Sequence, residues 1–560
     1  MQAHLQPRES RGLWAVSAAL LSLAAAFIGC RDQDPVSPSY QNTKPSPPSH
    51  FEQSACPIEF PPSLKVDCGV LTVPENRVND NGRTIRLPVA IVRARSSSPA
   101  PDPIVLVTGG PATNEIDPFF AQFFASLPFA ANRDFVFYNQ RGVGFADPRL
   151  GCPEFDRALA TAFPADPTLS QALATVAQCR DRLAGQGIEL DAYNSAEDAA
   201  DLRDLRVALG YSEWNMYVFS AGGIIGLTAM RLYPEGIRSV ILDSPLGNTY
   251  EIVTDLQRAH IRLLEMIFAR CAANAACEAA YPNLRTRFYD RVHALRVQPV
   301  VLSIPVEGGG SRSLTVDGDQ LLNESSACED PFCALDMPAR LDAVARGDVA
   351  GFFDFTFSPN EPRDPFMAEG KKGVSHCHDS YAFEHTSDRQ QAARELPEFR
   401  SLILDPLRFI PDKWNTEESC QVWRVGRAEP AQHRPVTSAI PTLVLAGEWD
   451  GGVSPVHDQE IASTLSRSFF VEFQGIGHFT LIWRLVTGTD CPARIAAEFI
   501  TSPTTRPNSG CAATLPEPAF TPPSFAASNR FAPREDPSMD RRLLPLTGRS
   551  RAGHILNRRK

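Results

Sequence analysis

The sequence is short of positive charge and of common metal-binding motifs. Its 54 Lys and Arg residues are outnumbered by 65 Asp and Glu, which gives a net charge of −11 for 560 residues. Nucleic-acid binding depends on clustered positive charge, so we expect no nucleic-acid partner. No two cysteines have Cys-x-x-Cys spacing, which argues against structural zinc. We find no internal repeat, and we expect no cofactor.

One His-rich stretch favours the alternative, a metal site. His376, Cys377 and His378 are followed by His385, and these residue types can ligate a metal ion. No second cluster of Cys or His lies nearby in the sequence. We therefore predict that the chain has no metal site.

The N-terminus carries the features of an export signal. Arg8 and Arg11 precede an uncharged apolar run over residues 13–28, which is too short for a comfortable membrane span. The run leads into Phe27-Ile28-Gly29-Cys30, which resembles the lipobox of bacterial lipoproteins. Cys30 is thus the predicted lipidation site, and the expected location is the bacterial cell envelope, anchored to the membrane through the N-terminal lipid. The alternatives are cleavage by the ordinary signal peptidase and an uncleaved anchor.

The remaining twelve cysteines form an even set, which an oxidising compartment would pair. Spacing cannot establish the connectivity, and pairing between neighbours is our prediction. The predicted pairs are Cys56–Cys68, Cys152–Cys179, Cys271–Cys277, Cys328–Cys333, Cys377–Cys420 and Cys491–Cys511.

Short apolar segments with strand character alternate with helical ones. The predicted strands cover residues 84–92, 104–108, 134–138, 215–219 and 239–242, and then 441–445 and 469–473. Helices are predicted from residue 195, where Ser195 and Asp198 have capping-box spacing, and over 222–232. This alternation favours a mostly parallel α/β sheet. The gap between residues 242 and 441 is too long for a simple crossover, so we expect a large, mainly helical lid insertion.

These patterns divide the chain into segments. The predicted segments are a lipoprotein signal peptide (1–29), a Pro/Ser-rich disordered tether (30–50), the first part of the core (51–245), the lid insertion (246–435), the second part of the core (436–502) and a Pro/Arg-rich disordered tail (503–560).

The stretch 214–226 (WNMYVFSAGGIIG) places a serine between an apolar strand and an apolar helix. This is the arrangement of the α/β-hydrolase nucleophile elbow, in which Ser220 would be lifted above the sheet edge. The usual motif has Gly two residues before the serine, where this chain has Val218. Backbone N–H groups of Gly110, on an upstream Gly-Gly turn, and of Ala221 are the predicted oxyanion hole.

Two further residues complete a candidate triad. Asp450 follows the predicted strand 441–445, and His478 follows the last predicted strand. The order Ser, Asp, His is that of α/β-hydrolases, and each residue follows the C-terminal end of a strand, where such sheets bind ligands. Asp243 is the alternative acid, although a loop-capping role suits it better.

At this point the chain resembles the proline iminopeptidase and tripeptidyl-aminopeptidase group of serine peptidases. The matching motifs are TGGPA at 108–112, NQRGVG at 139–144, VFSAGG at 218–223, GEWDGGVSP at 447–455 and GIGH at 475–478. Departures from the family pattern are Thr108 for His, Ala112 for Gly, Asn139 for Asp and Val218 for Gly. Arg141 is expected to bind loop carbonyls or acids beneath the site.

The resemblance implies an α/β-hydrolase fold and an aminopeptidase that forms an acyl-enzyme. In the iminopeptidase type, lid carboxylates bind the substrate's α-amino group, and Asp379 and Glu384 are the candidates here. The expected partner is a peptide or ester substrate. A carboxylesterase of the same fold and a catalytically inactive binding protein are the competing hypotheses.

Overall fold

The computed structural model describes residues 49–79, 81–110, 113–162, 167–305, 310–326, 331–352, 366, 368–406, 416–517 and 519–520. Cys30 and the predicted signal, most of the tether and most of the tail lie outside these residues. Within the described ranges, no helix is both long enough and apolar enough to cross a membrane.

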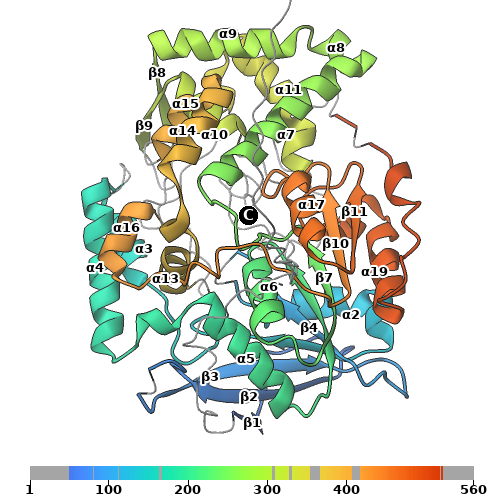
Figure 1. The fold of residues 1–560 in the computed structure, drawn as a ribbon. Coiled ribbons are helices and arrows are strands. Elements are labelled where there is room, and N and C mark those ends of the chain that lie inside the picture. Colours follow the sequence, from blue (N-terminus) through green and yellow to red (C-terminus); the bar gives the residue numbers. More distant parts are fainter. Residues whose placement is uncertain are drawn as a thin grey trace, which may run out of the picture.

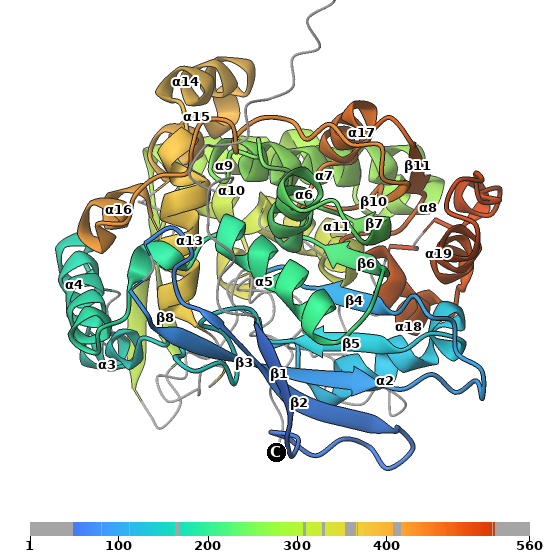
Figure 2. The same cartoon turned by 60° about the horizontal axis from the view of Figure 1, so that its bottom comes forward.

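A nine-stranded sheet forms the centre of the molecule (Figure 1, Figure 2). Its strands, in spatial order, are β1 (His50–Gln53), β2 (Val66–Pro74), β3 (Thr84–Val92), β5 (Phe135–Tyr138), β4 (Ile104–Val107), β6 (Trp214–Phe219), β7 (Ile237–Asp243), β10 (Thr442–Gly447) and β11 (Ser468–Phe473). The pairs from β1 through β3 to β5 are antiparallel, and all pairs from β5 to β11 are parallel.

Helices cover both faces of this sheet, so its central strands β4, β5, β6 and β10 are buried on both sides. The core helices are α2 (Pro118–Ser126), α5 (Ser195–Ala208), α6 (Gly222–Leu232), α17 (Pro455–Thr464), α18 (Arg484–Thr487) and α19 (Cys491–Thr501). Helices α3 (Pro153–Ala162) and α4 (Leu169–Gly185) instead pack against α13 (Glu369–Asp379) and α16 (Glu417–Trp423) of the insertion described next. Alternate strand residues separate two apolar cores. One packs against α2 and α19, and the other packs against α5, α6 and α17.

The chain between β7 and β10 is mainly helical and lies at the top and left of Figure 1. It contains α7 (Thr254–Ala273), α8 (Ala275–Ala280), α9 (Leu284–Val297), α10 (Gly318–Ser326), α11 (Pro331–Ala345), α12 (Val349–Phe352), α13 (Glu369–Asp379), α14 (Thr386–Glu395), α15 (Arg400–Leu404) and α16 (Glu417–Trp423). A hairpin of β8 (Val300–Pro305) and β9 (Ser311–Val316) lies within it. Its first part has its own apolar core around α7, α9, α10 and α11.

The predicted strands are confirmed with shifts of one or two residues at their ends. The strand predicted over 441–445 is β10, and it pairs in parallel with β7 of the same sheet. Helix α6 begins and ends as predicted. The α/β-hydrolase fold class is therefore correct.

The predicted cap of α5 is wrong. Asn194 is the N-cap, and its side chain accepts hydrogen bonds from the backbone N–H groups of Ala196 and Glu197. Ser195 instead binds Asp379, and Asp198 pairs with Lys371, both from the lid helix α13. Long-range partners thus decide the geometry of this helix end.

Five of the six predicted disulfides are present. They join Cys56–Cys68, Cys152–Cys179, Cys271–Cys277, Cys377–Cys420 and Cys491–Cys511. The sixth predicted pair, Cys328–Cys333, falls outside the described side chains. Each of these bonds closes a local loop, which restricts the unfolded chain.

Candidate active site

Ser220 occupies a sharp turn between β6 and α6. Its backbone has a φ of +53°, a conformation that non-glycine residues seldom adopt. Glycines allow the chain to pass closely on either side of this turn. A Cβ atom at Gly222 would lie 2.5 Å from the carbonyl oxygen of Val107, and one at Gly223 would lie 2.4 Å from that of Leu246. The strained turn presents the serine hydroxyl at the end of the parallel strands, as a nucleophile elbow does.

Val218, where the family motif has glycine, is accommodated by a glycine elsewhere. Its side chain is fully buried, and a Cβ atom at Gly226 of α6 would lie 2.9 Å from both Val218 methyl groups. The absent side chain at position 226 leaves space for the branched one at 218. The departure from the motif therefore leaves the elbow intact.

A continuous chain of hydrogen bonds joins three of the predicted site residues. The Nε2 atom of His478 lies 2.9 Å from the Oγ atom of Ser220, and its Nδ1 atom lies 2.8 Å from Oδ2 of Asp450. Asp450 is fully buried, and its Oδ1 accepts 2.8 Å hydrogen bonds from the backbone N–H groups of Gly452 and Val453. Such a chain can activate a serine hydroxyl as a nucleophile.

The loop that carries His478 is anchored on both sides. The ring of Phe479 stacks on Phe219 of β6 with a centroid separation of 4.5 Å. Just beyond it, Thr480 donates its backbone N–H to Oδ1 of Asp243 at 2.8 Å, and Leu481 donates to Oδ2. Tyr217 also donates its hydroxyl to Asp243. Asp243 thus caps this loop, as the sequence predicts. None of these hydrogen bonds goes to the ring of His478.

The Gly109–Gly110 turn lies against the nucleophile. A Cβ atom at Gly109 would lie 2.3 Å from the Ser220 Cβ and 2.7 Å from the Ala221 nitrogen, so only glycine fits there. Gly110 has a φ of +57°, which glycine adopts without penalty. The Gly109–Gly110 turn and the first residues of the elbow are therefore in close contact beside the serine hydroxyl. The predicted oxyanion hole draws one donor from each of these two segments.

Lid residues hold the turn that carries Asp450. Arg262 of α7 donates 2.8 Å hydrogen bonds to the carbonyl oxygens of both Glu448 and Asp450. The Tyr250 hydroxyl donates to the carbonyl of Gly452 at 2.8 Å. These contacts connect the lid to the acid loop of the core. Sequence reasoning missed both residues, because nothing in an arginine on an amphipathic helix indicates this target.

An acidic hollow of about 280 Å³ lies where the β7–α7 loop meets α14. Its lining includes Glu251, Asp255 and Asp388, together with the guanidinium group of Arg258. Burial, and then the charge of neighbouring Glu384, raise the pKa of Glu251 to about 8. The same loop reaches the elbow at its other end, where Leu246 donates its N–H to the Ser220 carbonyl. The hollow would favour a cationic ligand.

Glu384 lies beside this hollow. Its side chain is inaccessible to solvent, Oε1 accepts a 2.7 Å hydrogen bond from the Val253 N–H, and Oε2 lies 3.5 Å from Nε of Arg389. Burial raises its pKa. Of the two predicted lid carboxylates, Asp379 and Glu384, it is Glu384 that lies beside Glu251 of the acidic hollow.

Asp379 makes contacts of a different kind. Its carboxylate accepts hydrogen bonds from the backbone N–H and the hydroxyl of Ser195, at 2.9 and 3.0 Å, and lies 2.8 Å from Nδ1 of His378. The His378 charge and these hydrogen bonds outweigh the effect of burial and lower the pKa of Asp379. These contacts join α13 of the lid to the first turn of α5.

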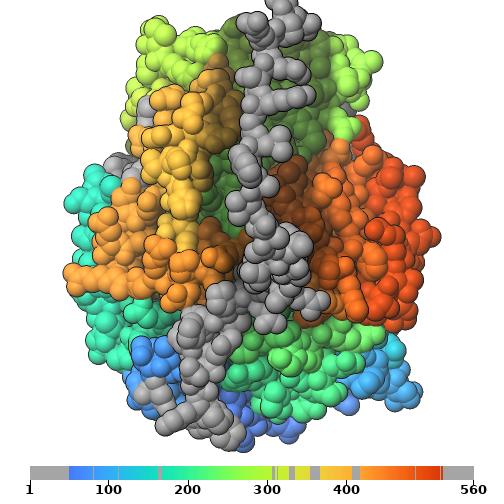
Figure 3. Space-filling view, in the orientation of Figure 1, coloured from blue at the N-terminus to red at the C-terminus, as the bar shows by residue number. Residues whose placement is uncertain are grey.

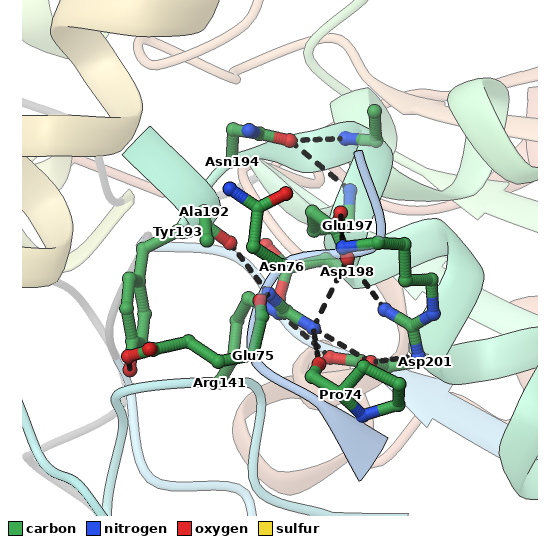
Figure 4. A network of polar contacts seen from close by, with 12 residues as sticks. Pro74, Glu75, Asn76, Arg141, Ala192, Tyr193, Asn194, Glu197, Asp198 and Asp201 are labelled. Carbon is green, nitrogen blue, oxygen red and sulfur yellow. Dashed lines mark hydrogen bonds and ion pairs between the residues drawn. The ribbon is translucent and has the colours of Figure 1, made fainter. Parts of the chain in front are cut away.

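Arg141 is fully buried in a polar network with residues of α5 and of the chain that follows β2 (Figure 4). Its guanidinium group binds both carboxylate oxygens of Asp201 at 2.8 and 2.9 Å and the carbonyl oxygens of Glu75 and Ala192. Arg77 binds Asp201 from the other side, at 2.7 Å. The predicted structural role of Arg141 is confirmed.

In the described part of the chain, one group of side chains has the spacing of metal ligands: Cys152, Glu154 and Cys179. Its two cysteines form a disulfide and offer no thiolate. Cys377 of the His-rich stretch is likewise bonded, to Cys420.

Two family models match the chain in sequence. The model described as "alpha/beta hydrolase fold" matches residues 102–266, and the model described as "TAP-like protein" matches residues 406–511. The serine protease Hip1 of Mycobacterium tuberculosis is 23% identical over 520 residues, covering 88% of this chain and 96% of that protein. A tripeptidyl aminopeptidase of Streptomyces coelicolor is 27% identical over 201 residues, covering 34% of this chain and 37% of that protein. Among solved structures, the proline iminopeptidase of Mycobacterium smegmatis has 14% identity and a TM-score of 0.33, covering 78% of this chain and 98% of that one.

The fold, the two family matches and the two relatives in sequence agree with the resemblance of the motifs. The chain is a serine hydrolase of the α/β-hydrolase fold with a TAP-like C-terminal part.

Proposed function

We propose that the protein is a serine peptidase that releases residues or short peptides from a free N-terminus. The observation that carries the proposal is the hydrogen-bonded chain from Ser220 through His478 to Asp450, on a serine held at positive φ. The serine protease and tripeptidyl aminopeptidase relatives support a peptide substrate.

The reaction follows from the roles that this geometry allows. The Oγ atom of Ser220 attacks the scissile carbonyl carbon while Nε2 of His478 takes the hydroxyl proton. Asp450 keeps the Nδ1–H tautomer of the histidine and stabilises the imidazolium. The N–H groups of Gly110 and Ala221 bind the oxygen of the tetrahedral intermediate. His478 then gives its proton to the leaving amine, and water hydrolyses the acyl-enzyme by the same steps.

The acidic hollow supplies the preference for a free amine. An ammonium group there would meet Glu251, Asp255 and Asp388 and would relieve the mutual repulsion that raises the pKa of Glu251. We include Glu384 in this subsite because its carboxylate adjoins Glu251. Asp379 is not part of the proposed subsite, since Ser195 and His378 occupy its carboxylate.

We also propose that the protein is exported and anchored to the cell envelope by a lipid on Cys30. The five disulfides support an oxidising compartment. The lipobox resemblance supports the anchor.

The test combines active-site labelling with paired substrates. A fluorophosphonate probe should label the wild type and leave Ser220→Ala unlabelled, because the probe reacts with an activated serine. A tripeptidyl chromogenic amide with a free N-terminus should be cleaved at least tenfold faster, in kcat/KM, than its acetylated counterpart. Labelling of Ser220→Ala would contradict the nucleophile assignment. Cleavage of short acyl esters with no cleavage of free-amine peptides would favour the carboxylesterase alternative.

A matched pair of variants tests the amine subsite. Glu251→Gln should raise KM for the free-amine substrate about tenfold, the cost of roughly 1.4 kcal/mol of charged hydrogen bonding. Glu265→Gln is the control, because Glu265 lies on α7 but pairs with Arg285. Equal effects of the two substitutions would contradict the subsite.

A further inference from the structure

Glu115 is a fully buried acid behind the oxyanion turn, and the mechanism above does not use it. Its Oε1 accepts a 2.7 Å hydrogen bond from the hydroxyl of Thr108, and its Oε2 accepts a 3.3 Å bond from Nδ2 of Asn139. Asn139 also donates to Asn114 at 2.8 Å. All of these donors are neutral. Among the described residues, no Arg, Lys or His side chain lies within ion-pair distance of Glu115.

The Thr108 hydroxyl links this carboxyl group to the nucleophile. Thr108 is the residue between β4 and the Gly109–Gly110 turn, and Gly109 lies against Ser220. The carbonyl oxygen of Thr108 accepts a 3.2 Å hydrogen bond from Nε2 of Gln140. The hydroxyl of Thr113 donates to the carbonyl of Gly110 at 3.1 Å. The turn that carries one proposed oxyanion donor is therefore held by three side-chain contacts, and Glu115 makes the one to the Thr108 side chain.

The groups around Glu115 do not neutralise its charge. Asp198 of α5 adds to the effect of burial, and the two raise the pKa of Glu115 to about 7 against the hydrogen bonds of Thr108 and Asn139. Asp198 itself pairs with Lys371 of α13 at 2.6 Å. Tyr138 of β5 is buried between these acids and Arg141, and its pKa is raised by the same burial. Glu115 thus changes its charge near neutral pH.

The two donors to Glu115 stand at positions where the chain departs from the family motifs. Thr108 replaces the motif's histidine and Asn139 replaces its aspartate. The structure places one carboxyl group between these two neutral side chains. Thr108 and Asn139, two departures from the family motifs, therefore contact the same carboxyl group.

We propose that Glu115 is a positioning residue for the oxyanion hole: by accepting the Thr108 hydrogen bond, its carboxylate holds the Gly109–Gly110 turn against Ser220. This inference rests on the proposed function of Ser220. The ionised carboxylate can accept both donors at once. Protonation removes the charge that strengthens both bonds. A proton on Oε2 faces the Nδ2 donor of Asn139, and a proton on Oε1 reverses the bond with the Thr108 hydroxyl, so either change loosens the turn.

The test uses Glu115→Gln, with Asp102→Asn as its matched control. Asp102 is also a buried carboxylate, but it lies at the opposite end of β4, where it binds Arg133 at 3.0 Å and Asn215 at 2.9 Å. Glu115→Gln should lower kcat about tenfold, on the scale of a weakened oxyanion donor, with KM within twofold of the wild type. The affinity for a peptide boronic acid, whose tetrahedral adduct occupies the oxyanion hole, should fall by a similar factor. Asp102→Asn should lower the melting temperature and leave both quantities unchanged.

The pH profile separates positioning from general support of the fold. Glu115 should contribute to the acid limb of kcat in the wild type, and this contribution should be missing in Glu115→Gln. If Glu115→Gln does not fold, Thr108→Val serves instead, because it removes the same hydrogen bond while Glu115 stays in place, and it should lower kcat three- to tenfold.

A folded Glu115→Gln variant with unchanged kcat, boronate affinity and acid limb would overturn this inference and leave the proposed function standing. Failure of the fluorophosphonate probe to label the wild type would overturn it together with the proposed function.

Discussion

Replacing Asp450 by Asn tests the triad against its closest alternative, because Asp243→Asn is an isosteric control at the end of the neighbouring strand. Both aspartates are fully buried, and both accept backbone N–H groups. They differ in their remaining partner. Asp450 faces Nδ1 of His478, whereas Asp243 faces the hydroxyl of Tyr217.

The structure determines how an amide at position 450 would be oriented. The N–H groups of Gly452 and Val453, each at 2.8 Å, hold an oxygen at the Oδ1 position. The amide NH₂ must then point at Nδ1 of His478, so the histidine proton moves to Nε2. That proton blocks Nε2 from accepting the proton of Ser220.

We therefore expect Asp450→Asn to lower kcat by about 10⁴-fold, as in other triads, which corresponds to roughly 5 kcal/mol of transition-state stabilisation. Asp243→Asn should lower kcat less than tenfold, because the amide oxygen can keep the Thr480 N–H and the Tyr217 hydroxyl can accept from the amide. Its stability should fall by about 1–2 kcal/mol. The assay is turnover of the tripeptidyl amide, with circular dichroism to verify folding. A larger loss of kcat in folded Asp243→Asn than in Asp450→Asn would refute the assignment of the acid.

Three further outcomes follow from single contacts. Arg262→Met removes two hydrogen bonds to the turn of Glu448 and Asp450, so kcat should fall three- to tenfold and stability by about 1–3 kcal/mol; an unchanged kcat would show that the lid contact does not position the acid. The pKa of Glu251 is about 8 in the folded protein, against an ordinary value of 4.5. Between these two pH values the folded state keeps a proton that the unfolded state releases. The free energy of unfolding therefore falls as the pH rises through this window. Glu251→Gln should accordingly raise the melting temperature at pH 9 and change it little at pH 4.5, and a larger gain at the acid end would contradict the raised pKa. Cys30→Ala should move the protein from the membrane fraction to the soluble fraction on cell fractionation, and an unchanged distribution would rule out the lipid anchor.

The sequence by itself determined the features that depend on neighbours along the chain. Apolar runs bounded by turn residues located seven of the nine strands of the sheet, including β10 after the long insertion, because strand formation reflects local alternation and burial on both faces. Strands β1 and β2, at the antiparallel edge, were not predicted. Pairing between adjacent cysteines was predictable for the same reason, since each described disulfide closes a loop of local chain. Ser220, Asp450 and His478 could be proposed because each lies in the turn or loop that follows a strand.

Only the tertiary structure decided the features that depend on partners far apart in sequence. Ser195 matched a helix cap locally, yet its hydroxyl binds Asp379, 184 positions away. The space for Val218 comes from Gly226 on the next helix, and the support of Asp450 comes from Arg262 in the lid, 188 positions away. Hydrogen bonds and close packing are short-range in space, and a single sequence contains no record of which distant residues the fold brings within that range. The roles of Asp379 and Arg262 therefore emerge only when the lid and the core are folded together.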